Sequence, residues 1–321
     1  MTIRKITIEN FTVFKNIEVD FCNGINILIG ENATGKTHLL KLLYALNTLY
    51  SSDYLVNMSQ LFGRNFRVCN CWLSVNDTLE QPWRVGLDNG VMLAPESRIS
   101  ATIEAKKPGT YIPAMSLLSI PDITRVVDEY GKNIDIDYTQ TEIVRKAENT
   151  IPENIPPLAK ASAQPLEDEI GGKVHFDVAD KSFWIYKNNG EKIPYSAEAE
   201  GHKKFGLLWR LLMNKGITKD TVLFWDEPEA NLNPTLIPIL VEVLMELARS
   251  GVQIFLATHD YNLMKYFSVK MKASDEVAFL SLYKTESGVA CERENDYDLL
   301  EHNSIVDADI QMVKDEIGGS E

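Results

Sequence analysis

Residues 30–37 have the types and spacing that bind phosphate, because they fit the pattern G-x-x-x-x-G-K-[ST]. In such a loop, backbone N–H groups and the following helix N-terminus hold phosphate oxygens. Lys36 would contact the β- and γ-phosphates, and the hydroxyl of Thr37 would bind magnesium. The predicted phosphate-binding residues are Gly30, Glu31, Asn32, Ala33, Thr34, Gly35, Lys36, Thr37 and His38.

Two further groups of polar residues follow apolar runs in the second half of the chain. Asp226 and Glu227 end the run 221–225, and His259 ends the run 252–258. Open α/β sheets place ligands at the carboxyl ends of their strands. Asp226 is therefore suited to hold magnesium through water, and Glu227 to orient or deprotonate an attacking water. An acidic turn is the alternative for the pair, and a structural histidine for His259, but a phosphate loop in the same chain favours function.

The elements around the loop fit this chemistry. Residues 25–29 predict a buried strand, and leucines at helical spacing predict a helix to about Tyr50. Alternation over residues 1–21 predicts a half-buried hairpin, in which Phe11 and Phe14 either stack on adenine or belong to the core. Residues 51–112 predict an antiparallel patch of short strands, including 66–75 and 99–105. Gln60, before these strands, either reaches a metal-bound water or lies in an exposed loop, and the loop is favoured.

The middle of the chain has a different character. After a core strand at 110–116, residues 121–172 predict an inserted helical arm with helices at 122–130, 139–149 and 158–170. Prolines, among them Pro165, are expected to break these helices. The arm either contacts another chain or is a solvated elaboration. Two strands joined to a hairpin turn at 187–190 follow.

Helix and strand patterns continue to the end. Asn233 and Pro234 predict the cap and first residue of a helix that ends near Ser250, with Pro238 bending or delaying its start. Residues 277–282 predict a last strand. A loop and an acidic helix over 304–317 are expected after it.

Composition restricts the function further. The 321 residues are 45% hydrophobic and 24% charged, and no apolar run is long enough to cross a membrane. The start of the chain lacks the apolar core of a signal peptide, and the four cysteines form neither a disulfide framework nor zinc-ligand spacing. We therefore expect a cytoplasmic protein. A net charge of −14 argues against a broad DNA-coating surface but leaves a local basic groove open.

Together these motifs resemble the ABC-type ATPase heads of the SMC, RecF and OLD group, in particular the stand-alone prokaryotic ATPases of anti-phage systems. The resemblance covers residues 1–60 and about 190–285. It identifies 30–37 as the Walker A loop, 223–227 as Walker B with the catalytic glutamate, 229–234 as the D-loop and His259 as the switch histidine. It implies hydrolysis of ATP by Lys36, Glu227 and His259, with Mg²⁺ at Thr37 and Asp226, in a dimer.

The signature segment departs from this family. The usual Leu-Ser-Gly-Gly-Gln helix start, which completes the other subunit's ATP site, corresponds here to residues 196–205. Ala199 stands where the family has serine, so one hydroxyl contact to the γ-phosphate is missing. Gly201 still permits close approach to a phosphate. Of His202, Lys203 and Lys204, one compensates by charge, or all three are a solvated face.

The resemblance implies a P-loop NTPase of class α/β, with one domain over residues 1–321, a mostly parallel sheet, an antiparallel patch and the helical insertion at 121–172. The favoured function is a slow, ATP-dependent regulator of a separate effector, a nuclease or toxin, in antiviral defence. A RecF- or SMC-like DNA-repair ATPase is the alternative. A transporter subunit fits less well, because the signature is irregular and no span is predicted.

Overall fold

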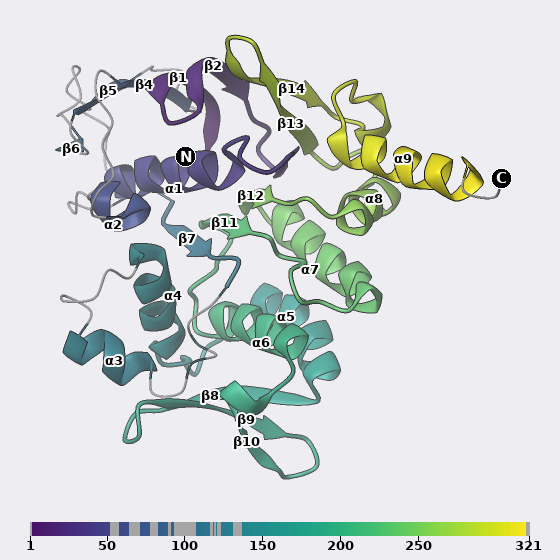
Figure 1. The fold of residues 1–321 in the computed structure, drawn as a ribbon. Coiled ribbons are helices and arrows are strands. Elements are labelled where there is room, and N and C mark those ends of the chain that lie inside the picture. Colours follow the sequence, from purple (N-terminus) through teal and green to yellow (C-terminus); the bar gives the residue numbers. More distant parts are fainter. Residues whose placement is uncertain are drawn as a thin grey trace.

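The computed structural model of the chain is shown in Figure 1. It describes residues 2–51, 58–63, 71–77, 83–88, 91–92, 107–115, 118, 120, 123–130 and 137–318. The strand predicted at 99–105 and the first half of the one predicted at 66–75 lie outside these residues.

A central sheet carries the motifs of the phosphate loop, Walker B and the switch histidine. Its strand order is β14-β13-β3-β12-β11-β7. All neighbours from β13 to β7 pair in parallel, and β14 pairs antiparallel with β13 at one edge. The strands are β3 (Ile25–Gly30), β7 (Gly109–Ile112), β11 (Val222–Asp226), β12 (Gln253–Ala257), β13 (Val277–Thr285) and β14 (Gly288–Glu294). The mostly parallel sheet is confirmed, and the polar ends of β3, β11 and β12 meet at one edge.

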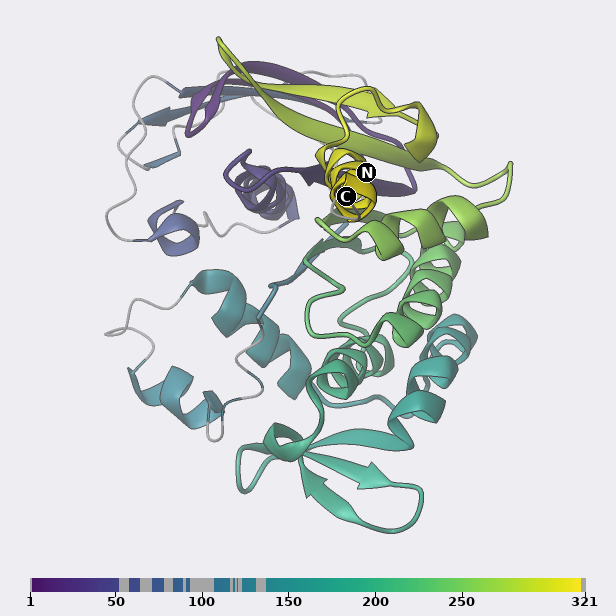
Figure 2. The same cartoon turned by 45° about the vertical axis from the view of Figure 1, so that its right-hand side comes forward.

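The two faces of this sheet are buried against different partners, as Figures 1 and 2 show. Helix α1 (Lys36–Ser51) covers one face, and α6 (Glu200–Met213), α7 (Ile237–Arg249) and α8 (Tyr261–Lys270) lie on the other. Side chains alternate between the two cores because successive residues of a strand point to opposite faces. Thus Ile27 joins the core of α6 and α7, whereas Leu28 joins the core around α1.

An antiparallel sheet lies beyond α1 and closes the second core. Its strand order is β2-β1-β4-β5-β6. The strands are β1 (Ile3–Phe11), β2 (Phe14–Asp20), β4 (Cys71–Asp77), β5 (Trp83–Asp88) and β6 (Val91–Met92). Buried Gln253 ties it to the central sheet, accepting from the Ile3 N–H and donating to the carbonyls of Ile3 and Cys22. The predicted hairpin and antiparallel patch are confirmed, and short α2 (Met58–Phe62) carries Gln60, which was predicted to be in a loop.

The helical insertion is packed into the domain. It contains α3 (Ile123–Tyr130), α4 (Tyr138–Glu148) and α5 (Pro157–Ile170). Buried Ile143 and Leu166 bring α4 and α5 into the main core, so both helices are part of the domain. Pro165 lies inside α5, and the expectation that it breaks the helix is wrong. It sits on the exposed face beside exposed Ala161, where water can bind the carbonyl that loses its partner.

The remaining elements follow the prediction with two additions. A small sheet contains β8 (Gly172–Asp177), β9 (Ser182–Lys187) and β10 (Lys192–Pro194), with the predicted turn between the last two. Pro238 does delay its helix: a 3₁₀ turn over Pro234–Leu236 precedes α7. Helix α8 was not predicted, and β14 replaces the loop expected after β13. Helix α9 (Ser304–Gly318) projects from the body (Figure 1). No helix among the described residues is both long and apolar enough to cross a membrane.

Candidate functional site

The phosphate loop connects β3 to α1 through a strained turn. Ala33 and Gly35 have positive φ angles of 64° and 92°. A Cβ on Gly35 would lie 2.6 Å from Cζ of Phe14, so only glycine fits between the loop and this ring. Phe11 and Phe14 are fully buried in the core, and of the two interpretations left open for them the structure supports the core one.

Lys36 folds back over the loop. Its Nζ donates to the carbonyls of Gly30 at 2.7 Å and Glu31 at 3.0 Å. Burial lowers the pKa of Lys36, and the nearby carboxylates of Asp226 and Glu227 only partly offset this. An anion next to the Lys36 ammonium would stabilise its charged form, which burial disfavours. The environment of Lys36 therefore suits the binding of a phosphate.

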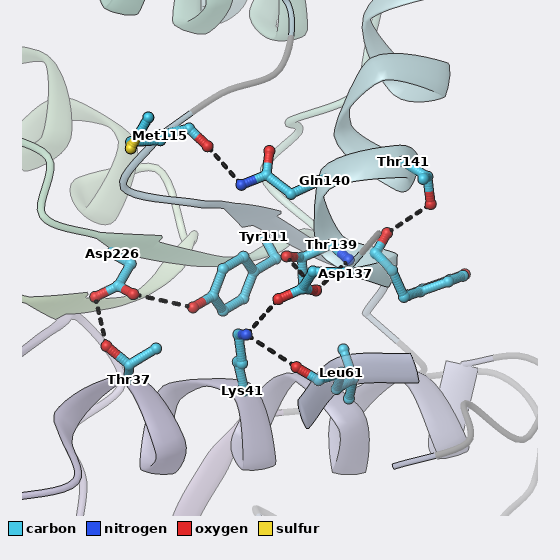
Figure 3. Close-up of polar contacts among 11 residues, drawn as sticks. Thr37, Lys41, Leu61, Tyr111, Met115, Asp137, Thr139, Gln140, Thr141 and Asp226 are labelled. Atoms are coloured by element: carbon cyan, nitrogen blue, oxygen red, sulfur yellow. Dashed lines mark hydrogen bonds and ion pairs between the residues drawn. The ribbon is translucent and has the colours of Figure 1, made fainter. Parts of the chain in front are cut away.

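Asp226 and Thr37 come together although they are far apart in the sequence. Thr37 Oγ1 donates to Asp226 Oδ1 at 3.2 Å, and the Tyr111 hydroxyl donates to Asp226 Oδ2 at 3.4 Å (Figure 3). Burial raises the pKa of Asp226, and these two hydrogen bonds oppose the shift. Within the described chain no lysine, arginine or histidine forms an ion pair with it, so this buried carboxylate fits a cation. Oxygen ligands of Mg²⁺ stand at about 2.1 Å from the ion, which suits two oxygens spaced as these are.

Glu227 and His259 face each other across the ends of β11 and β12. Glu227 Oε1 lies 3.5 Å from His259 Nδ1, and their side chains are 37% and 55% exposed. The Glu227 backbone is left-handed, with φ of 46°, and its N–H donates to the carbonyl of Ala257. The backbone conformation of Glu227 thus directs its carboxylate toward the solvent-exposed surface.

Lys204 enters this site from the signature helix, a contact that the sequence analysis did not foresee. Its Nζ donates to the carbonyl of Glu227 at 2.6 Å and lies 3.4 Å from that of Pro228. Burial lowers the pKa of Lys204 to about 8, against the attraction of Glu229 and Glu227. A lysine at the start of an amphipathic helix gives no hint in sequence that it touches a strand end.

The D-loop and the switch strand share a second buried link. Thr258 Oγ1 donates to Glu229 Oε1 at 2.7 Å, while Glu229 Oε2 has no hydrogen-bond partner among the described residues. Burial raises the pKa of Glu229. Thr258, directly before His259, is therefore joined to Glu229, two residues after Glu227, which links the two motifs.

The signature segment begins α6 as predicted, but its charged residues are engaged within the chain. Ala199 is the N-cap, and its side chain makes no capping bond. His202 lies 3.2 Å from Glu198, and buried Lys203 pairs with Glu200 at 2.6 Å. The interpretation of Lys203 and Lys204 as a solvated face is therefore wrong. Gly201 is buried next to Leu232 and Leu236, and its approach to a phosphate stays a prediction.

A polar network joins α1 to the insertion next to the metal-binding candidates (Figure 3). Lys41 donates to Asp137 and to the carbonyl of Leu61, and Asp137 caps α4 by accepting from the N–H of Thr139. The ring of His38 packs on Phe62, with ring centroids 5.5 Å apart. Burial and the nearby charge of Lys41 lower the pKa of His38, and its contact with phosphate stays a prediction.

Two contacts of the site were not predicted from the sequence. Tyr111 and Lys204 contact Asp226 and the Glu227 backbone from elements distant in sequence. Only the buried character of the strand at 110–116 pointed to Tyr111, and it gave no partner.

Two family models match the chain. Residues 103–265, about half of the chain, match the family described as "AAA domain, putative AbiEii toxin, Type IV TA system", and residues 1–79 match "AAA ATPase domain". The second match includes the phosphate loop, and the first includes Walker B and the switch histidine.

Curated relatives match a short part of the chain. The DNA replication and repair protein RecF of Oenococcus oeni is 45% identical over 47 residues, which are 15% of this chain and 13% of that protein. RecF of Lactobacillus acidophilus is 46% identical over 46 residues, 14% of this chain and 12% of that protein. The match thus spans about an eighth of the length of these relatives.

Solved structures cover far more of the chain. The SMC head domain from Thermotoga maritima has a TM-score of 0.51 at 14% identity, covering 92% of this chain and 99% of that one. An SmcHead bound to the C-winged helix domain of ScpA has a TM-score of 0.56 at 14% identity, covering 92% and 98%. At such identities the likeness shows the fold.

The fold and the family matches lead to one conclusion. The chain belongs to the AAA-domain family matched by residues 103–265, its first 79 residues match an AAA ATPase domain, and its fold is that of the SMC heads.

Proposed function

We propose that two copies of this ATPase close around Mg²⁺-ATP, and that this closure controls a separate effector protein, such as a nuclease or a toxin, in anti-phage defence. The observation that carries the first part is the exposure of Glu227 and His259, which face each other 3.5 Å apart at an open surface. Phosphoryl transfer needs water excluded and charge neutralised around the γ-phosphate. One copy leaves that side uncovered.

The chain's own residues supply most of such a site. Lys36 and the loop N–H groups would bind the phosphates, and Thr37 and Asp226 would hold Mg²⁺, which neutralises phosphate charge when bound. Glu227 would take a proton from the attacking water, and His259 would contact the γ-phosphate. The uncapped start of α6, at Ala199 and Gly201, would reach the other copy's nucleotide with its positive dipole end.

Control of an effector is argued from the family description and from the charge of the chain. The description of the family matched by residues 103–265 names the matched domain as a "putative AbiEii toxin" of a toxin–antitoxin system, so it supports a system of more than one component but not a separate toxin. The strong net negative charge fits a protein partner better than a DNA surface.

A RecF-like role in DNA repair is the second candidate, favoured by the short stretch of high identity to RecF proteins. Stimulation of ATP hydrolysis by DNA, falling steeply with salt, would support it over effector control.

The first test is the native mass of Glu227→Gln with and without Mg²⁺-ATP. Without a base to activate water, ATP stays bound, so we expect the mass to rise from one chain to two. Light scattering after gel filtration measures this. The rise should be absent in Lys36→Ala/Glu227→Gln, which lacks the phosphate-binding ammonium. Normal hydrolysis by Glu227→Gln, or a monomer at saturating Mg²⁺-ATP, would contradict the proposal.

A further inference from the structure

Helix α9 exposes a stripe of apolar side chains. Val306, Ile310, Val313 and Ile317 follow one another at intervals of four, three and four residues, the spacing of the a and d positions of a heptad. Val306 is partly buried against the main core, but the other three are 47%, 47% and 70% exposed. Beyond its first turn, the apolar face therefore has no cover within the described chain.

Residues 310–318 of α9 gain little stability from interactions within the helix alone. Helices of this length are marginal in water unless an apolar face is packed. Asn303 secures the start by accepting at 3.3 Å from the N–H of Val306, but every residue from Ile310 to Gly318 is exposed. The helix projects away from the sheets in Figure 1. This geometry suits a second helix laid along the stripe.

The charges beside the stripe indicate which kind of second helix would bind along it. The positions that flank a and d carry Asp307, Asp309, Lys314 and Glu316, three acids against one base. The segment leading into α9 adds Asp296 and Glu301, whereas Asp298 between them pairs with Lys265. Flanking charges of a coiled coil choose the partner by sign. A second copy of α9 would bring its own excess of acids, whereas a basic helix would complement them.

We propose that α9 is a docking helix for a partner protein that presents a basic amphipathic helix, with lysine or arginine beside its own apolar stripe. This assigns the surface through which the effector of the proposed function binds, and in that respect it rests on that function. The docking surface is defined by Val306, Ile310, Val313 and Ile317 and their flanking acids.

The test uses the full chain without nucleotide and a fluorescent three-heptad peptide with leucine at a and d and lysine at e and g. Two control peptides are needed: one with glutamate at e and g, and one with the basic composition shuffled out of register. We expect the basic peptide to bind, and both controls to bind about tenfold more weakly or worse, since the interaction needs both stripe and charge. Amide exchange over residues 310–318 should slow on binding.

The protein variants locate the site. Ile310→Ser/Val313→Ser/Ile317→Ser should lose binding about tenfold or more because the apolar contact is removed. Met312→Ser, a change at a side chain that is 62% exposed but off the stripe, should bind as the wild type does. All three changes of the triple variant are at exposed positions, so ATP turnover should persist and report an intact fold.

Three results would overturn the proposal. They are equal binding of the shuffled peptide, undiminished binding by the triple variant, and a nucleotide-independent dimer that the triple variant lacks, which would make a second copy the occupant. Because these measurements omit ATP, they can fail while Glu227→Gln still dimerises with Mg²⁺-ATP, and the reverse is equally true.

Discussion

The buried tyrosine beside Asp226 gives the first residue-scale prediction. Tyr111 donates to Oδ2 at 3.4 Å, which leaves Oδ1 facing Thr37. Burial raises the pKa of Tyr111 well above its ordinary value, so the hydroxyl stays a donor through neutral pH. Tyr111→Phe removes this hydrogen bond, and the Asp226 carboxylate should bind Mg²⁺ less favourably by about 1 kcal/mol because it is less well oriented. The Mg²⁺ concentration that half-saturates ATP hydrolysis should rise about fivefold.

Tyr44→Phe is the matched control. Tyr44 packs against Tyr111, with ring centroids 5.4 Å apart, but its hydroxyl donates to Glu142. A general loosening of this core would shift the Mg²⁺ dependence equally in both variants and would speak against a role for Tyr111 in orienting Asp226.

Lys204 gives the second residue-scale prediction. A left-handed backbone at Glu227 costs about 1–2 kcal/mol for a residue with a Cβ. The Lys204 ammonium helps to hold it through the Glu227 carbonyl. Lys204→Met should therefore lower kcat about tenfold or more while ATP binding changes by less than about twofold, because the catalytic group is misplaced and the phosphate loop is untouched. Steady-state kinetics measure both.

Lys203→Met is the control, since Lys203 is on the same turn but pairs with Glu200. Stability adds an independent check. With its pKa lowered to about 8, Lys204 binds its proton less tightly in the folded protein than in the unfolded one. The stability of the wild type relative to Lys204→Met should rise with pH between about 8 and 10.5. Similar kinetic losses in the two variants would refute the positioning role.

At this scale, sequence identified residues whose motif carries its own chemistry. Gly30 to Thr37, Asp226, Glu227 and His259 are recognisable because phosphate and magnesium demand those types at those positions. Tyr111, Lys204 and Glu229 are not, because ordinary core and helix residues acquire a role only through the contacts that folding creates.

At the scale of elements, Asp137 connects the insertion to the helix of the phosphate loop. Its Oδ1 accepts from the N–H of Thr139 at 2.9 Å, and its Oδ2 pairs with Lys41. Asp137→Ala removes a helix cap and the ion pair, and should lower the free energy of unfolding by about 1–2 kcal/mol. Urea unfolding followed by fluorescence measures the change.

Asp137→Asn separates the two contributions. An asparagine still caps α4 but cannot pair with Lys41, so we expect roughly half the loss. If both variants unfold like the wild type, α4 is not held to α1 through this residue.

Periodicity predicted most elements because burial on one face imposes it. The helices at 123–130, 138–148 and 157–170 were anticipated within a residue or two. Periodicity did not predict elements that are only partly buried or whose conformation depends on tertiary surroundings. Strand β14 is an edge strand of mixed burial, α2 is a single short helix, and the exposed setting of Pro165 is not encoded in its neighbours.

Sequence motifs also could not reveal how the whole molecule is arranged. Glycine loop, Walker B and switch histidine predicted a parallel sheet, and β3, β12 and β11 are indeed neighbours. That β1 would be tied to the central sheet through Gln253 was not predictable, since a glutamine in an apolar run shows no partner. Gln253 thus joins the antiparallel sheet to the central sheet that carries the phosphate loop.

The charge of the whole molecule sets the last prediction. Two copies of a chain with net charge −14 repel each other as they approach. Raising the salt concentration from about 50 to about 300 mM shortens the screening length from roughly 14 to roughly 6 Å. Dimerisation of Glu227→Gln with Mg²⁺-ATP should therefore become tighter with salt, as sedimentation equilibrium can measure. A DNA-binding ATPase would behave oppositely, because salt weakens phosphate contacts. Association that weakens steeply with salt and needs DNA would favour the repair function over effector control.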